Sequence, residues 1–360
     1  MPPRRLWLSW AEQLPLMEED GAMGLEVVRR SRSGPRYVMV EDRQGMGLPY
    51  SKGLMATSIM ATGLPPEQAF ALAEAIEQEL LDWGRESVSA DELAELAGRV
   101  LALRLGSAVA ESYRAWRRAK RSSKPIVVLI GGATGVGKST VATRLGARLG
   151  ITRIIPTDAV REVMRNIISE DVLPSIHVSS FEVHRRESGP AVKGVDPVLA
   201  GFQRQAEAVA AGLKGLVARA VTERVDIIVE GAHVLPGLRG REGAEWSADQ
   251  AAVVEVMLGI DDPAAHRAHF LARQEHEHGR RPDRYLKSFA EIRRIQSYLG
   301  ELAVAHGVPQ LDSANLDATI QALLEMVVRA VTDEVEFSYT ASRAASRLSA
   351  PITRRVPAAR

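Results

Sequence analysis

The chain has 360 residues, a formal net charge of +1 and no cysteine, and 46% of its residues are hydrophobic. This length exceeds that of one ordinary hydrophobic core and indicates two domains. The balanced charge excludes a global attraction to nucleic acid or to a membrane surface, and the lack of cysteine excludes disulfides and thiolate metal sites. Since no apolar run could span a bilayer and MPPRRLWLSW does not resemble a signal peptide, we expect a cytoplasmic protein.

Residues 1–24 lack a sustained hydrophobic period, so we expect a loosely attached arm. Two short β-type runs follow, LEVVRR at 25–30 and RYVMVED at 36–42, and the Ser-Gly-Pro between them at 33–35 predicts a hairpin. A second turn is predicted at 45–49, where glycine and proline cluster.

Helices are predicted after this turn. Ser51 is placed to cap the first, which ends at Gly63, and the second begins at Pro66 with apolar residues at helical spacing. Ser89 and Glu92 form a capping box that opens a further helix.

This module, residues 25–117, resembles the ATP-cone, a regulatory nucleotide-binding domain. The likeness rests on VEDRQGMGLPYSKGLMATSIMATGL at 40–64 and on the later AESYRAW. In that family a basic β-hairpin and a P-[FY]-S-[KR] segment contact nucleotide phosphates, which implies Arg43, Ser51 and Lys52 here. The alternative is a module that only packs or dimerises, because Glu-Asp precedes Arg43 where ATP-cones commonly have a Lys-Arg pair.

A short basic linker, 118–124, leads to PIVVLIGGATGVGKST, an apolar strand that ends in glycines and opens a helix. It fits G-x-x-x-x-G-K-[ST], in which backbone N–H groups turn inward around a phosphate and the helix N-terminus faces the same point. Lys138 would reach the β- and γ-phosphates of ATP, and the Ser139 hydroxyl would ligate Mg²⁺. The predicted nucleotide-binding residues are Gly132, Thr134, Gly135, Val136, Gly137, Lys138, Ser139 and Thr140.

A second strand is predicted at 153–157, with Asp158 just past its end. Ligands of open parallel sheets bind at the carboxyl ends of the strands, so this carboxylate is expected to face the phosphates. Arg161 and Arg165 follow at helical spacing on roughly the same face. The polar, turn-rich segment 167–186 is predicted to contact substrate. Its candidate contacts are His177, Ser179 and Ser180.

After a long helix, the strand at 226–229 ends in Glu230. In many P-loop kinases a carboxylate in this position holds Mg²⁺ through water. His233 follows as a further candidate for contact with substrate. It either points into the site or caps the loop, and the residues alone do not decide between these roles.

Further buried strands are predicted at 252–261 and 309–312, each followed by a helix. Between them a helix is predicted to run to about Glu277, to break at 279–282 and to resume at Tyr285, which is the shape of a lid. Closure of this lid would bring guanidinium groups over the transferring phosphoryl group. The arginines of this segment are Arg273, Arg280 and Arg281.

Four histidines in the same segment have H-x-x-H and H-x-H spacings that would suit a metal. They are His266, His269, His276 and His278. A complete tetrahedral ligand set is missing and charged residues separate the histidines, so we favour a solvated surface over a zinc site. The tail at 334–360 has no hydrophobic period and is predicted to be disordered.

The segment 125–333 alternates five strands with helices. The predicted fold class is therefore α/β, with a parallel five-stranded sheet, flanking helices and a lid as in P-loop kinases, preceded by the ATP-cone-like domain. Over residues 125–332 the chain resembles the 2-phosphoglycerate kinase family, on IPTDAVREVMR, IISEDVLPSIHVSSF, VEGAHVLPG and RYLKSFAEIRRIQSYL. That family also carries an N-terminal ATP-cone.

The resemblance implies a kinase that converts ATP and 2-phosphoglycerate into ADP and 2,3-bisphosphoglycerate. The residues by themselves reach only as far as phosphoryl transfer to a small anionic substrate. In this interpretation Lys138 and Mg²⁺, held by Ser139 and Glu230, neutralise the γ-phosphate. Asp158 orients or deprotonates the acceptor hydroxyl, the two arginines after it bind the acceptor's anionic groups, and the lid arginines complete the site.

Other readings keep the same fold. They are a related P-loop protein of inositol-phosphate metabolism, a nucleotide-dependent regulator with little turnover, and an ATP-sensing interaction protein. No nucleic acid or membrane partner is expected, and self-association into a homo-oligomer is left open.

Overall fold

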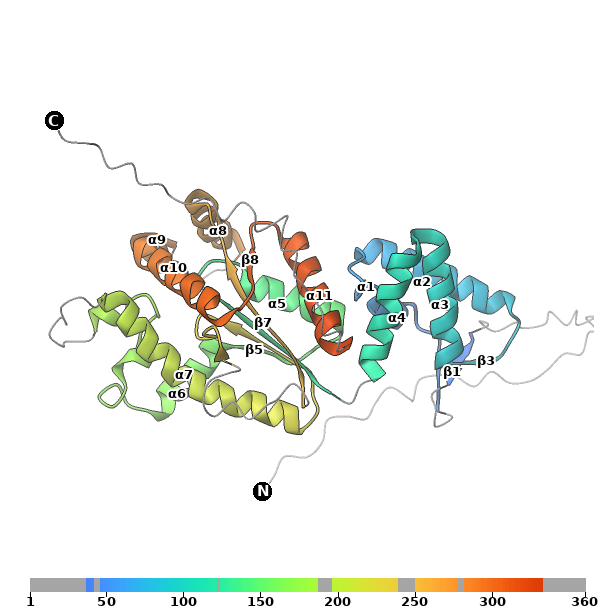
Figure 1. Cartoon of the computed structure of the whole chain (residues 1–360), viewed down its shortest axis with the longest axis horizontal. Coiled ribbons are helices and arrows are strands. Elements are labelled where there is room, and N and C mark those ends of the chain that lie inside the picture. The colour runs from blue at the N-terminus through green and yellow to red at the C-terminus, as the bar shows by residue number, and fades with distance from the viewer. Residues whose placement is uncertain are drawn as a thin grey trace, which may run out of the picture. The chain divides into compact units, whose positions relative to one another are not determined.

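The computed structural model describes residues 37–41, 46–121, 124–186, 196–238, 250–276 and 282–332 (Figure 1). The predicted arm, the predicted strand at 25–30 and the predicted disordered tail lie outside these ranges. Within them, no helix combines the length and the apolar character that crossing a membrane requires.

Among the described residues, the N-terminal module combines a small sheet with four helices. Its strands are β1 (Met39–Glu41), β2 (Gly47–Pro49) and β3 (Ser87–Ser89), and its helices are α1 (Lys52–Met60), α2 (Pro66–Asp82), α3 (Ala90–Leu105) and α4 (Ser107–Arg121). Strand β1 lies in the centre and pairs antiparallel with β2 and parallel with β3. Ile59, Ile76, Leu96 and Tyr113 bring all four helices into one buried core.

The second predicted turn is wrong in part. Residues 47–49, which the sequence placed in a turn, form β2, and Leu48 lies opposite Val40 in the ladder with β1. A three-residue edge strand ending in proline has a weak hydrophobic pattern, so its glycine and proline dominated the prediction.

Both predicted helix caps of the module are confirmed. The Ser51 hydroxyl accepts a hydrogen bond from the amide of Leu54 at the start of α1. Ser89 and Glu92 form both halves of the capping box before α3. Helix α4 continues to Arg121, so the first residues of the predicted linker are helical.

The second domain is built on five parallel strands, as the sequence predicted. They are β4 (Ile126–Gly132), β5 (Ile154–Pro156), β6 (Ile227–Gly231), β7 (Ala252–Gly259) and β8 (Gln310–Asp312). Their order in the sheet is β5-β6-β4-β7-β8. Every residue of the central strand β4 is buried, as expected for a parallel strand covered on both faces.

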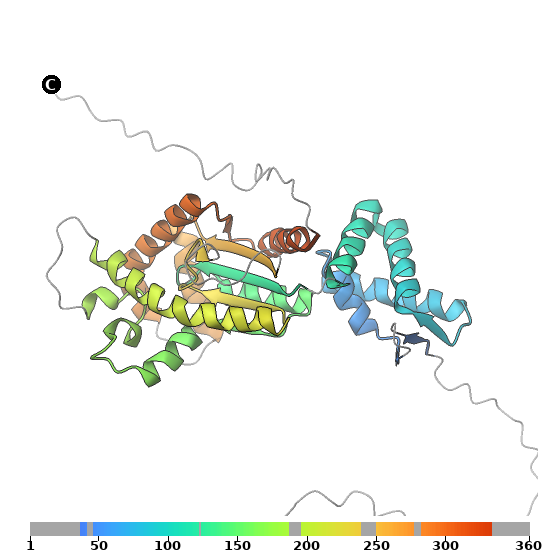
Figure 2. The same cartoon turned by 60° about the horizontal axis from the view of Figure 1, so that its bottom comes forward.

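Helices cover both faces of this sheet (Figures 1 and 2). They are α5 (Lys138–Leu149), α6 (Thr157–Ile167), α7 (Pro197–Thr222), α8 (Pro263–His276), α9 (Pro282–Lys287), α10 (Phe289–His306) and α11 (Leu316–Thr332), with the 3-10 turns η1 (Pro174–His177) and η2 (Val183–Arg185). Val127 and Leu129 of β4 pack into the core that includes α7. Val128 and Ile130 point the other way, into the core that includes α5 and α11. The alternation follows from the two-residue period of a strand.

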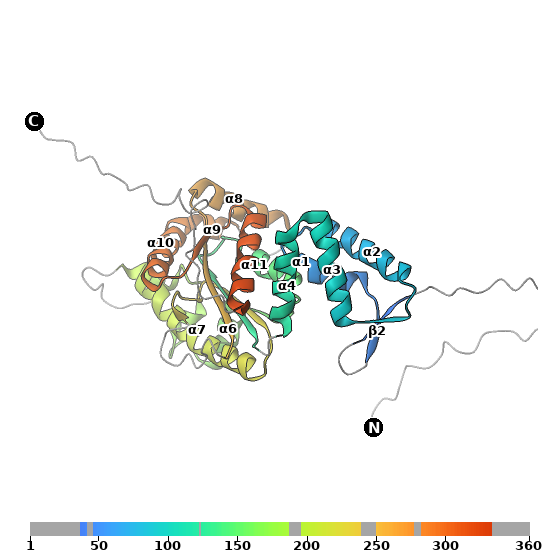
Figure 3. The same cartoon turned by 45° about the vertical axis from the view of Figure 1, so that its right-hand side comes forward.

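The predicted lid corresponds to α8, α9 and α10, which follow one another on one side of the domain (Figure 3). Helix α8 is described as far as His276 and α9 from Pro282, and the predicted break at 279–282 lies, except for Pro282, outside the described residues. The predicted second helix is divided, because Ser288 separates α9 from α10.

Candidate active site

The carboxyl ends of β4, β5 and β6 meet at one edge of the sheet. The parallel register places Glu230 of β6 opposite Ile130 of β4 and opposite Pro156 of β5. The loop after β4, the start of α6 with Asp158, and Glu230 therefore converge at this edge. Open parallel sheets bind their ligands in this position.

The loop after β4 has the backbone geometry of a phosphate cradle. Gly132, Gly135 and Gly137 have φ angles of +145°, +90° and +81°, which glycine adopts with little cost. A Cβ on Gly135 would lie only 2.3 Å from a ring atom of Phe270, so this position also lacks room for a side chain. Gly137 precedes the first residue of α5, Lys138, and the positive end of that helix faces the loop.

Ser139 and Glu230 supply hard oxygen atoms beside this loop. The Ser139 hydroxyl donates a hydrogen bond of 2.8 Å to Glu230 Oε1, and the Glu230 side chain is buried, with only 5% of the residue exposed. Hydroxyl and carboxylate oxygens are the ligands that Mg²⁺ prefers, either directly or through water. The pair fits a magnesium ion bound next to a triphosphate.

The side chain of Lys138, the first residue of α5, reaches back to the loop that precedes the helix. Its Nζ atom donates a hydrogen bond of 2.7 Å to the carbonyl oxygen of Ala133. The ammonium group is therefore held across the loop, where a bound phosphate would meet it.

Asp158 is exposed at the start of α6, and its carboxylate is 3.3 Å from Arg161 Nε. Desolvation by the surrounding protein acts to raise the pKa of this carboxyl. The charge that His233 carries when protonated and the charges of Arg161 and Lys138 outweigh that effect and hold the pKa below its usual value. Asp158 is therefore ionised at neutral pH and presents a hydrogen-bond acceptor.

Arg161 has a second set of contacts. Its Nη1 atom donates to the carbonyl oxygens of Ile176 at 2.8 Å and Val178 at 3.2 Å. The guanidinium group thus ties the start of α6 to the polar segment that the sequence predicted as a substrate contact.

His233 is buried in a chain of polar side chains. Its Nδ1 atom is 2.8 Å from the Thr157 hydroxyl and its Nε2 atom is 3.0 Å from Gln205 Oε1. The Gln205 amide group donates to the carbonyls of Ser175 and Val178, so its oxygen must accept from His233 Nε2–H. His233 Nδ1 then accepts from Thr157.

This arrangement uses both ring nitrogens of a residue that is only 1% exposed. Burial lowers the pKa of His233 to about 4, against the attraction of Asp158. The neutral ring connects β6 with α6, α7 and the segment after α6. It holds these parts together and does not present a free nitrogen to the site.

The remaining predicted substrate contacts lie around the same segment. Arg165 is paired with Glu162 at 2.9 Å on the exposed side of α6. His177 Nε2 is 2.9 Å from the carbonyl oxygen of Ile168. Ser179 and Ser180 are half-buried between η1 and η2.

The segment is also tied to the lid. Arg284 of α9 makes two hydrogen bonds to the Glu182 carboxylate, which lower the pKa of that carboxyl. Arg185 Nη2 lies 3.2 Å from both Ser288 Oγ and Glu291 Oε1. Of the predicted lid arginines, Arg280 and Arg281 lie outside the described residues, as does the side chain of Arg273.

The first two histidines of the lid contact the phosphate-binding loop. His266 Nε2 is 2.9 Å from the carbonyl oxygen of Thr134, and His269 Nδ1 is 3.2 Å from that of Gly135. In the described ranges no group of three His, Asp, Glu or Cys could hold a metal ion. The expected solvated surface is wrong for His266, which is fully buried, because its ring packs against the loop.

Sequence reasoning missed several residues of this site. It did not identify Gln205 as the residue that joins His233 to the polar segment, or His266 and His269 as contacts of the phosphate-binding loop. It also missed Ser313, whose hydroxyl donates to the Val136 carbonyl at 2.7 Å. For Gln205 the sequence offered one signal, a polar residue at a position of α7 where the helical period calls for an apolar one.

In the N-terminal module, two of the three predicted nucleotide contacts already have partners. The Ser51 hydroxyl caps α1. Lys52 Nζ lies 3.2 Å from Glu77 and 3.9 Å from Glu74, so a phosphate would have to replace these carboxylates. Arg43 lies outside the described residues.

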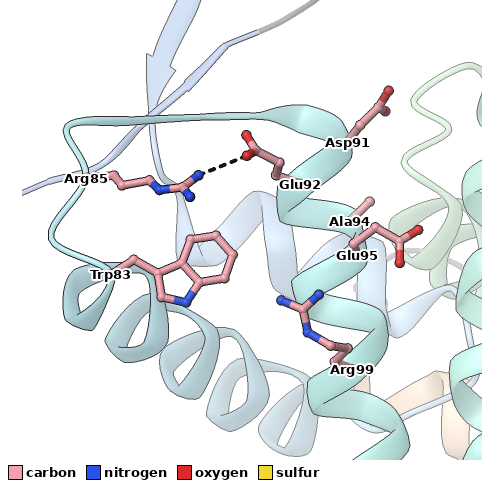
Figure 4. A pocket seen from close by; sticks show the side chains of 7 residues that line it. All are labelled: Trp83, Arg85, Asp91, Glu92, Ala94, Glu95 and Arg99. Carbon is pink, nitrogen blue, oxygen red and sulfur yellow. Dashed lines mark hydrogen bonds and ion pairs between the residues drawn. The ribbon is translucent and has the colours of Figure 1, made fainter.

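A surface pocket of about 740 Å³ lies between the end of α2 and the start of α3 (Figure 4). It is lined by Trp83, Arg85, Asp91, Glu92, Ala94, Glu95 and Arg99. Arg85 is bonded to Glu92 at 2.9 Å, and the Arg85 and Arg99 guanidiniums lie 5.4 and 6.0 Å from the Trp83 ring centre. Of the predicted nucleotide contacts that the structure describes, neither Ser51 nor Lys52 lines this pocket.

The five-stranded parallel sheet, the glycine-rich loop at the end of its central strand and the Ser139–Glu230 pair define a P-loop kinase domain. Residues 127–302 match the AAA domain family. A "2-phosphoglycerate kinase" of Methanopyrus kandleri strain AV19 is 37% identical over 318 residues, which cover 88% of this chain and 94% of that protein. The chain belongs to the 2-phosphoglycerate kinase family.

A second relative, a "2-phosphoglycerate kinase" of Thermococcus kodakarensis strain KOD1, is also 37% identical, over 80% of this chain and 95% of that protein. Among solved structures, a gluconokinase from Sinorhizobium meliloti 1021 matches 58% of this chain and 93% of its own, with 16% identity and a TM-score of 0.32. The match to the Methanopyrus protein is longer than the segment from Pro125 to the end of the chain, so it includes part of the N-terminal module.

Proposed function

We propose that this protein is an ATP-dependent phosphotransferase that converts 2-phosphoglycerate into 2,3-bisphosphoglycerate. The observation that carries the reaction class is the Ser139–Glu230 hydrogen bond beside a glycine-rich loop and a helix N-terminus. The acceptor is supported by relatives that are called 2-phosphoglycerate kinases and match most of the chain. A regulator with little turnover and a protein of inositol-phosphate metabolism find no such support.

The nucleotide would bind along the loop 132–140. The backbone N–H groups and Lys138 would hold the β- and γ-phosphates, and Ser139 and Glu230 would hold Mg²⁺. A bound Mg²⁺ neutralises charge on the phosphates. The role of the protein is then to fix the position of the phosphoryl group, because phosphoryl transfer needs positioning and charge neutralisation more than covalent help.

The acceptor would lie next to Asp158. Its free hydroxyl oxygen would form a bond to the γ-phosphorus as the bond to the ADP oxygen breaks, and the hydroxyl proton would pass to the Asp158 carboxylate or to solvent. A carboxyl group whose pKa lies below the usual value is a weak base. Asp158 therefore acts mainly by orienting the hydroxyl, which suits a transition state in which the attacking oxygen carries little new bonding.

The anionic groups of the acceptor would meet the cations and hydroxyls at the same edge of the sheet. Arg165 is partly exposed and only surface-paired, so it is available to a phosphate or carboxylate. We assign the same role to Arg161 and to the polar segment with His177, Ser179 and Ser180. The lid arginines Arg273, Arg280 and Arg281 would act after closure.

We further propose that the N-terminal module is an ATP-cone that binds a regulatory nucleotide through Arg43, Ser51 and Lys52. An effector there would act only through a difference in affinity between two states of the enzyme. Counting bound nucleotides on the full chain and on residues 121–360 tests this role. Two sites in the full chain and one in the truncation support it, whereas one site in both leaves a packing or assembly role.

The acceptor is tested by measuring ADP release with 2-phosphoglycerate, 3-phosphoglycerate, glycerate and inositol phosphates at equal concentrations. We expect kcat/KM for 2-phosphoglycerate to exceed the others at least 10-fold. Glycerate lacks the phosphate and inositol phosphates lack the carboxylate, whereas 3-phosphoglycerate has both groups but carries its free hydroxyl on a different carbon, away from the γ-phosphate. A preference for an inositol phosphate would overturn the acceptor assignment. If the protein binds ATP but releases no ADP in the presence of any of these acceptors, the enzyme assignment is overturned.

A further inference from the structure

Four consecutive carbonyl groups of the phosphate-binding loop each accept a hydrogen bond from a different side chain. The pairs are Ala133 with Lys138 (2.7 Å), Thr134 with His266 (2.9 Å), Gly135 with His269 (3.2 Å) and Val136 with Ser313 (2.7 Å). Two of these donors are histidines on α8, more than 120 residues away in the sequence. The loop is therefore held from outside as well as by its own glycines.

Holding a carbonyl group determines the direction of the next amide. In a trans peptide the C=O and the following N–H point in opposite directions within one plane. A hydrogen bond that keeps the Thr134 carbonyl turned toward α8 keeps the Gly135 N–H turned away from it. In the same way, the bond to the Gly135 carbonyl sets the direction of the Val136 N–H. These are two of the amides that a cradle of this kind points at a phosphate.

The surroundings of His266 hold its ring neutral and place one ring nitrogen as a hydrogen-bond donor. His266 is fully buried, and its Nδ1 atom has no hydrogen-bond partner among the described residues. The imidazole ring stacks on Phe270 and meets Phe289 edge-on. A carbonyl oxygen only accepts, so Nε2 carries the proton in the neutral ring. The packing fixes the ring against Gly135, where even a Cβ would approach His266 Nε2 to 3.0 Å.

His269 makes the neighbouring contact through its other ring nitrogen. It lies one helical turn after His266, half-buried, and uses Nδ1. Residues three apart on a helix lie on one face, which explains how both rings reach adjacent carbonyls. The H-x-x-H spacing, which can also indicate a metal site, here places two histidines beside two successive backbone carbonyl groups.

We propose that His266 and His269 are positioning residues that hold the Gly135 and Val136 amides toward the phosphates of the nucleotide. The proposal rests on the phosphate-binding role proposed above for the loop. Neither histidine touches the nucleotide in this account. Both act through the backbone, and through them α8, the first helix of the predicted lid, holds the loop.

The two nitrogens allow a test with crossed substitutions. The amide nitrogen of glutamine overlays Nε2 of histidine, and that of asparagine overlays Nδ1. His266→Gln and His269→Asn therefore keep the donor in place, whereas His266→Asn and His269→Gln remove it with a similar change of size and polarity. Leu271→Ala is the control for a change on α8, because Leu271 is exposed on this helix and is not part of the packing around His266.

Two readouts separate positioning from general stability. The first is the Kd of MgADP by calorimetry on the full chain, and the second is amide hydrogen exchange of the peptide covering 127–140 in protein without nucleotide. Each misplaced donor should weaken MgADP binding roughly 3- to 10-fold, the effect of one hydrogen bond, and speed exchange in the loop. The matched variants should stay within about 2-fold of wild type.

The proposal is overturned if matched and crossed variants bind and exchange alike, or if Leu271→Ala weakens binding as much as the crossed variants. Should His266→Asn fail to fold, the half-buried His269 pair decides the question alone. Failure of wild-type protein to bind MgADP would overturn the phosphate-binding role of the loop itself. Loop exchange without nucleotide would still decide whether the histidines hold the loop.

Discussion

We expect two buried histidines to make the kinase domain less stable in mild acid. Burial lowers the pKa values of His233 and His266 to about 4 from the usual 6.5. The unfolded chain takes up a proton at each histidine below pH 6.5, whereas the folded protein takes them up only near pH 4. Their contribution to stability is therefore fully present above pH 6.5 and is lost as the pH falls toward 4.

The size of the effect follows from the two values. Each pKa unit corresponds to 1.36 kcal/mol, so lowering the pH from 6.5 to 5 should cost about 2 kcal/mol per histidine, or about 4 kcal/mol in all. His266→Gln keeps the donor to the loop but cannot titrate, so this variant should lose only about half as much stability. His306→Gln, at an exposed position on α10, is the matched control and should lose as much as wild type.

The assay is urea unfolding followed by far-ultraviolet circular dichroism at pH 7.0 and 5.0, with wild type and both variants measured in parallel. Comparing variants at each pH cancels the contribution of carboxyl groups that they share. Equal losses for wild type and His266→Gln would refute the reasoning, because they would mean that the buried ring of His266 takes up its proton as readily as an exposed one.

Three substitutions test the reacting groups. Lys138→Ala should lower kcat by about 10²-fold or more with an unchanged circular dichroism spectrum, and near-normal turnover would remove the loop from the mechanism. Asp158→Asn should lower kcat with little change in the Kd of ATP; a collapse of ATP binding with normal acceptor kinetics would assign Asp158 to the metal site instead. Glu230→Gln should raise the Mg²⁺ concentration needed for half-maximal rate several-fold, and an unchanged Mg²⁺ dependence would argue against its role.

Local signals in the sequence accounted for the frame of the site. The phosphate-binding loop was predicted from the spacing of the glycines before Lys138, and the structure gives these glycines positive φ angles. The role of Glu230 was predicted from its position at the end of an apolar strand. Both depend on residues that are close in sequence. The parallel order of strands then brings the predicted groups to one edge.

The contacts that hold the loop from outside were beyond the reach of sequence reasoning. His266 and Thr134 are separated by 132 residues, and no local pattern states which carbonyl a helix face will meet. His233 was left with two roles because its spacing does not reveal that Thr157 and Gln205 lie on either side of its ring. Such pairings arise only once the sheet and its helices have packed together.

The central claim is that the chain transfers the γ-phosphoryl group of ATP to 2-phosphoglycerate. The most direct measurement is ³¹P NMR of wild-type protein with MgATP and 2-phosphoglycerate, run beside the Lys138→Ala variant. The account predicts two phosphomonoester resonances from 2,3-bisphosphoglycerate and the resonances of ADP in equal molar amount, with wild type only. Formation of ADP and inorganic phosphate without a second phosphomonoester, or equal product from the Lys138→Ala variant, would contradict it.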